Sequence, residues 1–176
     1  ITTNTNEADI IREIISKQKV KNLSNIIEYY EVFKLVFKDL KRNISREFPQ
    51  VGRYGEEINY YVILMDRVVP LDSKKCPEDI LTFFNDFIDN KFDYVNPAKA
   101  KKIANEILND IKGTDYENYS NYVYDMVNII DNYNSIGIDN NDIHSGNLGI
   151  NRMGSLVSFD PGGFMTKSSE IGELEV

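Results

Sequence analysis

Three oxygen-bearing side chains stand around a glycine-rich turn in the last third of the sequence. They are Asp142, Asn147 and Asp160, within the stretch DIHSGNLGINRMGSLVSFDPGG. Mg²⁺ prefers hard oxygen ligands and shares its shell with substrate phosphates, so one carboxylate and one amide oxygen from a protein can hold it. Phosphoryl transfer needs such a metal and a carboxylate that receives the proton of the acceptor hydroxyl. The three residues therefore predict a metal–phosphate site.

The elements expected around these residues would bring them to one point. A helix is predicted from Tyr119 to about Ser135, and Gly137 ends it just before the first aspartate. The segments NLGINR and SLVSFD, joined by MG, are typical of a small β-hairpin whose second strand leads to Asp160. The alternative is a loop and hairpin in which Asp and Asn side chains only cap turns.

Upstream, the sequence predicts a helix, two strands and two further helices. The first helix is expected to be capped by Asn6 and to present isoleucines at helical spacing. The strands are expected in IIEYYEVFKLVF and NYYVILMDRVV, with a charged insertion at about residues 38 to 59 between them. Pro77 and Asn96-Pro97 mark the next two helix starts. The residues after the hairpin are expected to form a loop.

The composition restricts the class of protein. With 176 residues and 41% hydrophobic content, the chain can bury the core of one domain or of a large part of one. Its net charge of −8 argues against nucleic acid or an anionic membrane as the main partner. No apolar run approaches the ~18 residues that span a bilayer. The single cysteine, Cys76, suits a reducing cytoplasm, and the Asn-, Ile- and Tyr-rich composition fits an AT-rich genome such as that of a virus or parasite.

The stretch GIDNNDIHSGNLGI…SLVSFDPGG resembles the catalytic loop and the metal-binding loop of the protein-kinase-like superfamily. Its form Asp-x-His-x-Gly-Asn is closest to the aminoglycoside phosphotransferase branch. The resemblance implies that Asp142 is the catalytic base and that Asn147 and Asp160 hold Mg²⁺ on ATP. It also implies that His144 contacts the transferring phosphate. The expected fold is α+β and kinase-like, with a mostly helical C-lobe, a small hairpin at the site and a partial N-lobe.

Two upstream segments extend the resemblance. REII…NLSNIIEYYEVF is similar to the kinase αC helix and the strand that follows it, which places Glu13 where a glutamate pairs with the ATP-binding lysine. A simpler interpretation is that Glu13 pairs with Lys17, four residues further on. YYVILMDRV resembles the kinase hinge, with Met65 as gatekeeper and Asp66 to Val68 offering backbone groups to adenine. Met65 can equally be a core residue.

The resemblance divides the chain into two parts and leaves one part of a kinase unaccounted for. Residues 1–68 are expected to form the partial N-lobe and hinge, and residues 69–176 the C-lobe-like catalytic region. Nothing before Glu7 has the pattern of a glycine-rich loop or of a strand bearing the ATP lysine. We expect these elements either upstream of Ile1 or absent from a reduced kinase-like domain.

The first functional hypothesis is an ATP- and Mg²⁺-dependent phosphotransferase. Its acceptor would be a Ser/Thr side chain of a protein or a hydroxyl of a small molecule. The second is a pseudokinase, a binding module that keeps the fold but transfers nothing. A third, a helical adaptor without nucleotide, requires the clustering of the three oxygen ligands to be coincidence. Neither nucleic acid nor a membrane is expected as a partner, and the sequence does not set the oligomeric state.

Overall fold

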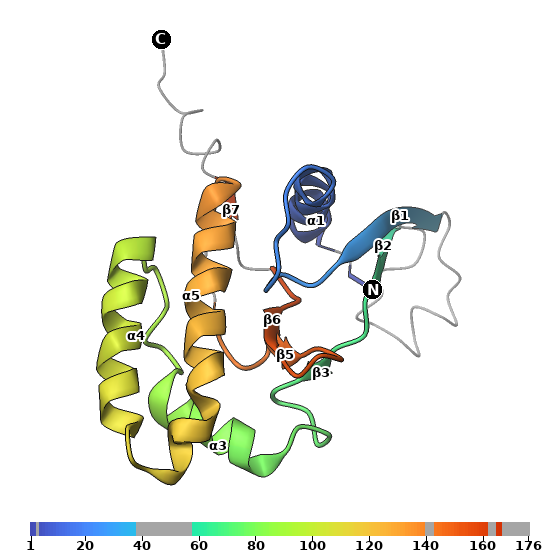
Figure 1. Ribbon diagram of the computed structural model, residues 1–176. Coiled ribbons are helices and arrows are strands. Elements are labelled where there is room, and N and C mark those ends of the chain that lie inside the picture. Colours follow the sequence, from blue (N-terminus) through green and yellow to red (C-terminus); the bar gives the residue numbers. More distant parts are fainter. Residues whose placement is uncertain (3, 38–57, 140–142, 162–164, 167–176) are drawn as a thin grey trace.

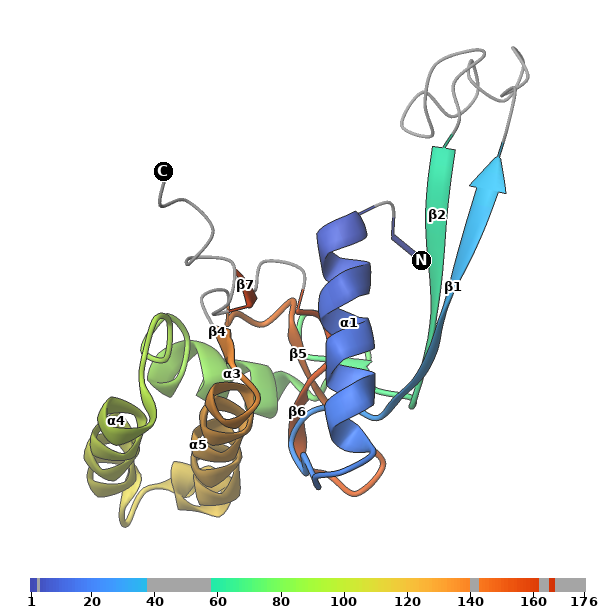
Figure 2. The same ribbon diagram turned by 90° about the horizontal axis from the view of Figure 1, so that it is seen from above.

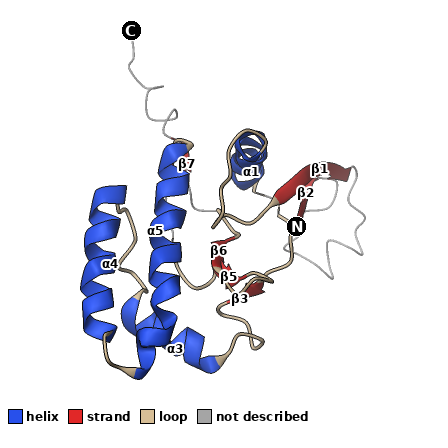
Figure 3. Ribbon diagram, viewed as in Figure 1, coloured by secondary structure: helices blue, strands red, loops and turns tan. Residues whose placement is uncertain are grey.

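The computed structural model describes residues 1–2, 4–37, 58–139, 143–161 and 165–166. Within these ranges helices and antiparallel strands form a mixed α+β fold (Figures 1 and 3), which confirms the expected class. In chain order the elements are α1 (Thr5–Gln18), β1 (Tyr29–Phe37), β2 (Ile58–Met65), β3 (Val69–Pro70), α3 (Glu78–Phe87), α4 (Pro97–Ile111), the 3₁₀ helix η2 (Asp115–Tyr119), α5 (Ser120–Ser135), β4 (Ile138–Asp139), β5 (Leu148–Ile150), β6 (Leu156–Ser158) and β7 (Met165–Thr166).

Helix α1 begins earlier than the sequence predicts. The side chain of Asn4 accepts hydrogen bonds from the backbone amides of Asn6 (3.0 Å) and Glu7 (3.3 Å), two of the amides that a helix start leaves unpaired. The expected cap, Asn6, therefore lies inside the first turn. Figure 2 shows α1 alongside the β1–β2 hairpin, and its buried residues are Ala8, Ile10, Ile11 and Ile14.

Strands β1 and β2 form the expected antiparallel pair, with Tyr29 opposite Met65. The outer edge of β2 pairs with the segment before α1. The Thr2 amide donates to the Tyr61 carbonyl at 3.0 Å, and the Tyr61 amide donates to the Thr2 carbonyl at 2.8 Å. Most of the expected insertion, about residues 38 to 59, lies outside the described part of the chain.

The helices α3, α4 and α5 form the opposite side of the molecule (Figures 1 and 2). Helix α4 begins after Asn96 as the sequence predicts, and the Asn96 side chain caps it by accepting the Lys99 amide at 2.9 Å. Helix α5 begins at Ser120, one residue after its expected start, and η2 precedes it. Gly113 and Gly137 follow α4 and α5 with φ of 74° and 76°. Glycine takes these left-handed values without a steric penalty, so both helices end where expected.

A three-stranded sheet in the order β3-β5-β6 lies between the two sides (Figure 1). The expected hairpin is present as β5 and β6, with Gly149 opposite Val157. The segment expected to be the hinge, residues 66–68, continues into β3, where Val69 pairs with Ile150. Strand β4 pairs with β7, so the prediction that only loop follows the hairpin is wrong at residues 165 and 166. Two residues are too few to show a strand pattern in sequence.

The core runs from α1 through the central sheet to α4 and α5. Its largest fully buried side chains are Tyr133, Phe83, Phe84, Phe92, Ile10, Ile11, Ile14, Leu71, Ile88, Ile107 and Ile111. None of the helices in the described ranges is both long and apolar enough to cross a membrane.

Candidate functional site

The β5–β6 hairpin brings the backbone segments of two of the three expected oxygen ligands side by side. Asn147 precedes β5, and its carbonyl accepts the Phe159 amide at 3.0 Å. Asp160 is the next residue, so the two candidate ligands are at most one position apart across the ladder. Asn147 is buried, with 6% of its surface exposed, and Asp160 is half-buried. The third expected residue, Asp142, lies outside the described residues.

The turn that carries Asn147 is held by backbone hydrogen bonds. The Asn147 amide donates to the carbonyl of His144 at 3.0 Å. The Gly146 amide donates to Nδ1 of the same histidine at 3.0 Å. A Cβ on Gly146 would lie 2.8 Å from Cε1 of His144, so glycine lets the ring fold back over the turn. His144, the expected phosphate contact, is exposed.

A cavity of about 330 Å³ lies where α1, the β1–β2 hairpin and the end of β6 meet. Met65, the expected gatekeeper, and Asp160, the expected metal ligand, both line it. The other lining residues are Ile1, Thr2, Glu7, Ile11, Tyr29, Ile63 and Phe159. The cavity therefore joins the strand that leads to the hinge with the predicted metal-binding end of the hairpin.

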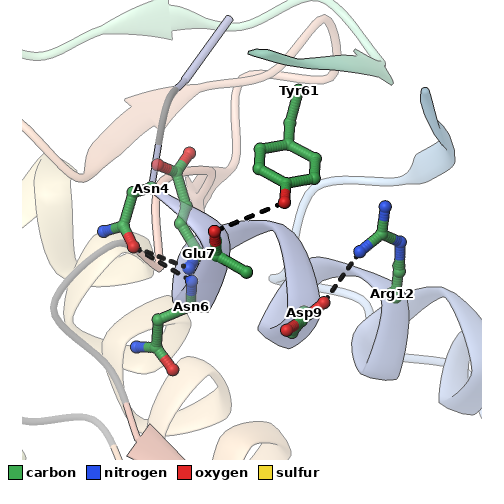
Figure 4. A network of polar contacts seen from close by, with 7 residues as sticks. Asn4, Asn6, Glu7, Asp9, Arg12 and Tyr61 are labelled. Carbon is green, nitrogen blue, oxygen red and sulfur yellow. Dashed lines mark hydrogen bonds and ion pairs between the residues drawn. The ribbon is translucent and has the colours of Figure 1, made fainter. Parts of the chain in front are cut away.

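The acidic residue that α1 presents to this cavity is Glu7, at the N-terminal end of the helix (Figure 4). Burial raises the pKa of its carboxyl group, and the Asp160 carboxylate raises the pKa further. A hydrogen bond with the Thr2 side chain opposes both effects. Glu7 is thus electrostatically coupled to Asp160.

The resemblance to kinases assigns this position facing the site to Glu13, not to Glu7. The helix geometry does not favour Glu13. Glu13 lies six residues after Glu7, which is about 9 Å along the axis and about 120° around it at 3.6 residues per turn. In the sequence, Glu7 is recognisable only as an acidic residue that favours a helix start. Recognising it requires knowing how the buried face of α1 packs, and hence the rotation of the helix about its axis.

Tyr29 holds the backbone next to Asp160. Its buried hydroxyl donates to the Phe159 carbonyl at 2.6 Å. Burial raises the pKa of this hydroxyl well above its usual value, so it stays a proton donor. The Phe159 amide is held by Asn147 as described above. Both backbone groups of the residue before Asp160 are therefore fixed.

The hinge residues contact the hairpin directly. The Asp66 amide donates to the Glu28 carbonyl at 2.9 Å, so this backbone donor is used within the fold. The Asp66 carboxylate accepts the Tyr30 hydroxyl at 2.9 Å and forms an ion pair with Arg152 at 3.1 Å. Arg152 comes from the β5–β6 turn, so this ion pair ties the hinge to the hairpin.

Val68 packs against a glycine of the same hairpin. A Cβ added to Gly149 would lie 2.4 Å from Cγ2 of Val68 and 2.7 Å from the Val69 carbonyl oxygen. The hinge approaches β5 this closely because glycine stands at this position. This close approach fixes how far the expected adenine-binding segment lies from the expected metal ligands.

Two side chains of the hairpin are of the types that suit a hard cation that also binds phosphate. They are the carboxylate of Asp160 and the amide of Asn147, whose oxygens match the ligand preference of Mg²⁺ with substrate phosphates in its shell. Within the described ranges, no three His, Cys, Asp or Glu side chains gather closely enough to hold a metal by themselves.

Comparisons of this chain with protein-family models, with curated proteins and with solved structures found no match. The function therefore has to be inferred from the geometry and chemistry of the site.

Proposed function

We propose that the protein is an ATP-dependent phosphotransferase of kinase-like type. In this proposal Asp142 receives the proton of the acceptor hydroxyl, while Asn147 and Asp160 hold Mg²⁺ on the nucleotide phosphates. The observation that supports it most is the Phe159–Asn147 backbone hydrogen bond, which brings the backbone segments of the two candidate ligands next to each other. The acceptor is a Ser/Thr side chain of a protein or a hydroxyl of a small molecule.

The order of the elements also supports the proposal. A helix is followed by an antiparallel strand pair, a hinge, helices and a hairpin, as the resemblance implies for a kinase-like chain. Met65 lines the same cavity as Asp160, so the strand entering the hinge lies next to the metal-ligand end of the hairpin. Residues 1–68 then act as the partial N-lobe and residues 69–176 as the catalytic region.

Each residue has a separate task in this scheme. Asp160 supplies anionic charge to the cation, and Asn147 supplies a neutral oxygen, so the site is not overloaded with negative charge beside the phosphates. Tyr29 keeps the backbone before Asp160 in place. Mg²⁺, when bound, neutralises charge on the phosphates and polarises the bond that breaks. His144 contacts the phosphate that is transferred.

We assign to Glu7 the role that the resemblance gives to Glu13. That role is to pair with the cationic group that orients the ATP phosphates. Glu7 lines the cavity together with Asp160, and its carboxyl group interacts electrostatically with the Asp160 carboxylate. Glu13 lies on another side of α1.

Calorimetry of the full chain with ATP tests the proposal. We expect ATP binding that requires Mg²⁺ and that Asp160→Asn weakens at least about ten-fold, since even outer-shell partners of metal ligands cost that much. The matched control is Asp86→Asn, which makes the same change on the exposed side of α3. Absence of ATP affinity with and without Mg²⁺ would overturn the proposal.

A second measurement separates an enzyme from a pseudokinase. Asp142→Ala should abolish phosphate transfer and leave nucleotide affinity largely intact, because the base does not hold the metal. Binding without transfer to any acceptor, water included, would identify a pseudokinase. Equal loss of binding and transfer would show that the roles of Asp142 and Asp160 are assigned wrongly.

A further inference from the structure

The loop between α3 and α4 holds the loop that leads into the β5–β6 hairpin. Oδ1 of Asp93 accepts a hydrogen bond from the backbone amide of Ile143 at 3.0 Å, across fifty positions of the chain. Ile143 directly follows Asp142 in sequence and is 3% exposed. A buried amide needs an acceptor, and a carboxylate is a strong one.

The loop that carries Asp93 is firmly anchored. Phe92 and Val95 are buried, at 1% and 2% exposure, on either side of it. Asn90 and Tyr94 have φ of 60° and 52°, left-handed values that asparagine adopts readily and that are unfavourable for tyrosine. Tyr94 is 78% exposed, so its own side chain gains little burial in return. The strained backbone lies directly beside the residue that reaches Ile143.

A continuous line of hydrogen bonds runs from this anchor to the candidate ligands. Asp93 holds the Ile143 amide, the adjacent His144 carbonyl accepts the Asn147 amide, and the Asn147 carbonyl accepts the Phe159 amide. This line links the position of the Ile143 amide to the backbone positions of Asn147 and Phe159.

We propose that Asp93 is a positioning residue for the segment Ile143–Asn147, and that this segment is set for phosphate transfer only while Asp93 accepts the Ile143 amide. The catalytic part of this inference rests on the proposed function. Asp93 touches neither metal nor substrate in the scheme and acts through the backbone alone.

Three variants of the full chain test the proposal. Asp93→Ala removes the acceptor, and Asp93→Asn keeps an oxygen in the same place without the charge. Asp86→Ala is the matched control, an exposed aspartate on α3. Because His144 is the only histidine, its ring signals in NMR spectra report on this segment without overlap.

The expected results are specific to the segment. In Asp93→Ala the Ile143 amide exchanges with solvent about ten-fold faster or more, and the His144 ring signals shift, while amides in α4 and α5 keep their rates. Phosphate transfer falls by about 100-fold in kcat with KM for ATP nearly unchanged, as expected for misplaced catalytic groups. Asp93→Asn recovers most of each loss, and Asp86→Ala changes none of them.

Several outcomes would overturn the inference. They are unchanged Ile143 exchange and His144 signals in Asp93→Ala, the same changes in Asp86→Ala, or no recovery in a folded Asp93→Asn. If Asp93→Ala does not fold, Asp93→Glu replaces it, since it moves the carboxylate by one methylene and should lower kcat with the fold intact. A wild-type chain that transfers no phosphate would overturn the proposed function and the catalytic part of the inference. In that case, hydrogen exchange of the Ile143 amide and the NMR signals of the His144 ring would still decide whether Asp93 fixes the segment Ile143–Asn147.

Discussion

Asn25 and Asp125, one hundred positions apart in the chain, share a side-chain hydrogen bond of 2.9 Å. Both residues also hold the first residue of β6. Nδ2 of Asn25 donates to the Leu156 carbonyl at 2.8 Å, and Oδ2 of Asp125 accepts the Leu156 amide at 2.9 Å. One pair of side chains therefore joins the segment after α1, helix α5 and the hairpin that carries the candidate ligands.

This pair should be energetically coupled. We expect Asn25→Ala to lower the free energy of unfolding by about 2 kcal/mol, because it leaves buried partners without hydrogen bonds. A double-mutant cycle with Asp125→Ala should give a coupling of about 1 to 2 kcal/mol in urea unfolding. The exposed ion pair Arg12–Asp9 is the control and should give about 0.5 kcal/mol or less. Additive effects of the two alanine variants would show that the pair is not a unit.

Asp125 should also make stability depend on pH. Burial raises the pKa of its carboxyl group above the ordinary value of 3.8, against the opposing hydrogen bonds from Leu156 and Asn25. The folded state therefore binds a proton at pH values where the unfolded state has released it. By linkage, this contribution to stability is present at low pH and is lost as pH rises from 3.8 through the raised pKa.

Urea unfolding between pH 3 and pH 7 measures this effect as a difference between the wild type and Asp125→Ala. The advantage of the wild type over the variant should shrink across that window and then level off. A difference that grows with rising pH would contradict the assigned direction of the shift.

Gly149→Ala should loosen the contact between hinge and hairpin. The added methyl group meets both Val68 and the Val69 carbonyl, and such overpacking costs about 1 to 3 kcal/mol. Adding Val68→Ala should restore only part of the loss in thermal stability, because the backbone carbonyl remains in the way. Full recovery in the double variant would show that only the valine side chain limits this approach.

Tyr29→Phe should affect the metal-ligand end of the hairpin. It leaves the Phe159 carbonyl without its buried donor, at a cost of about 1 to 3 kcal/mol. Tyr133→Phe is the matched control, because Tyr133 bonds to Ser158 within the same strand region at 2.9 Å. On the proposed function, calorimetry should show weaker Mg²⁺-dependent ATP binding for Tyr29→Phe than for Tyr133→Phe. Equal affinities would mean that Tyr29 supports the fold only.

On the proposed function, Glu7→Gln should lower phosphate transfer by about ten-fold or more, whereas Glu13→Gln should leave it within about two-fold of the wild type. Only Glu7 lines the cavity shared with Asp160. Initial rates at saturating ATP decide between the two residues. If Glu13→Gln lowers the rate more than Glu7→Gln, the role belongs to Glu13.

The helices and long strands could be predicted because their signals are local. The cap at Asn96, the glycines at positions 113 and 137 and the aromatic strands all act within a few residues of themselves. The pairing of the Asn147 and Asp160 regions was also predictable, because the two strands of a hairpin run antiparallel beside each other.

Other features have no local signal. Strands β3 and β7 exist because β5 and β4 offer them partners. The choice of Glu7 over Glu13 depends on the rotation of α1 about its axis, which is set by the packing of its buried face.

The sequence by itself determined the α+β class, the order of the elements and the oxygen-rich turn at residues 142–160, because these follow from backbone preferences and side-chain periodicity. Tertiary structure decided which acidic groups reach that turn. Glu7 approaches Asp160, Asp93 holds Ile143, and Asp125 holds Leu156 only because distant segments pack together. Such contacts are set by the relative placement of whole elements, and residue spacing along the chain carries no record of that placement.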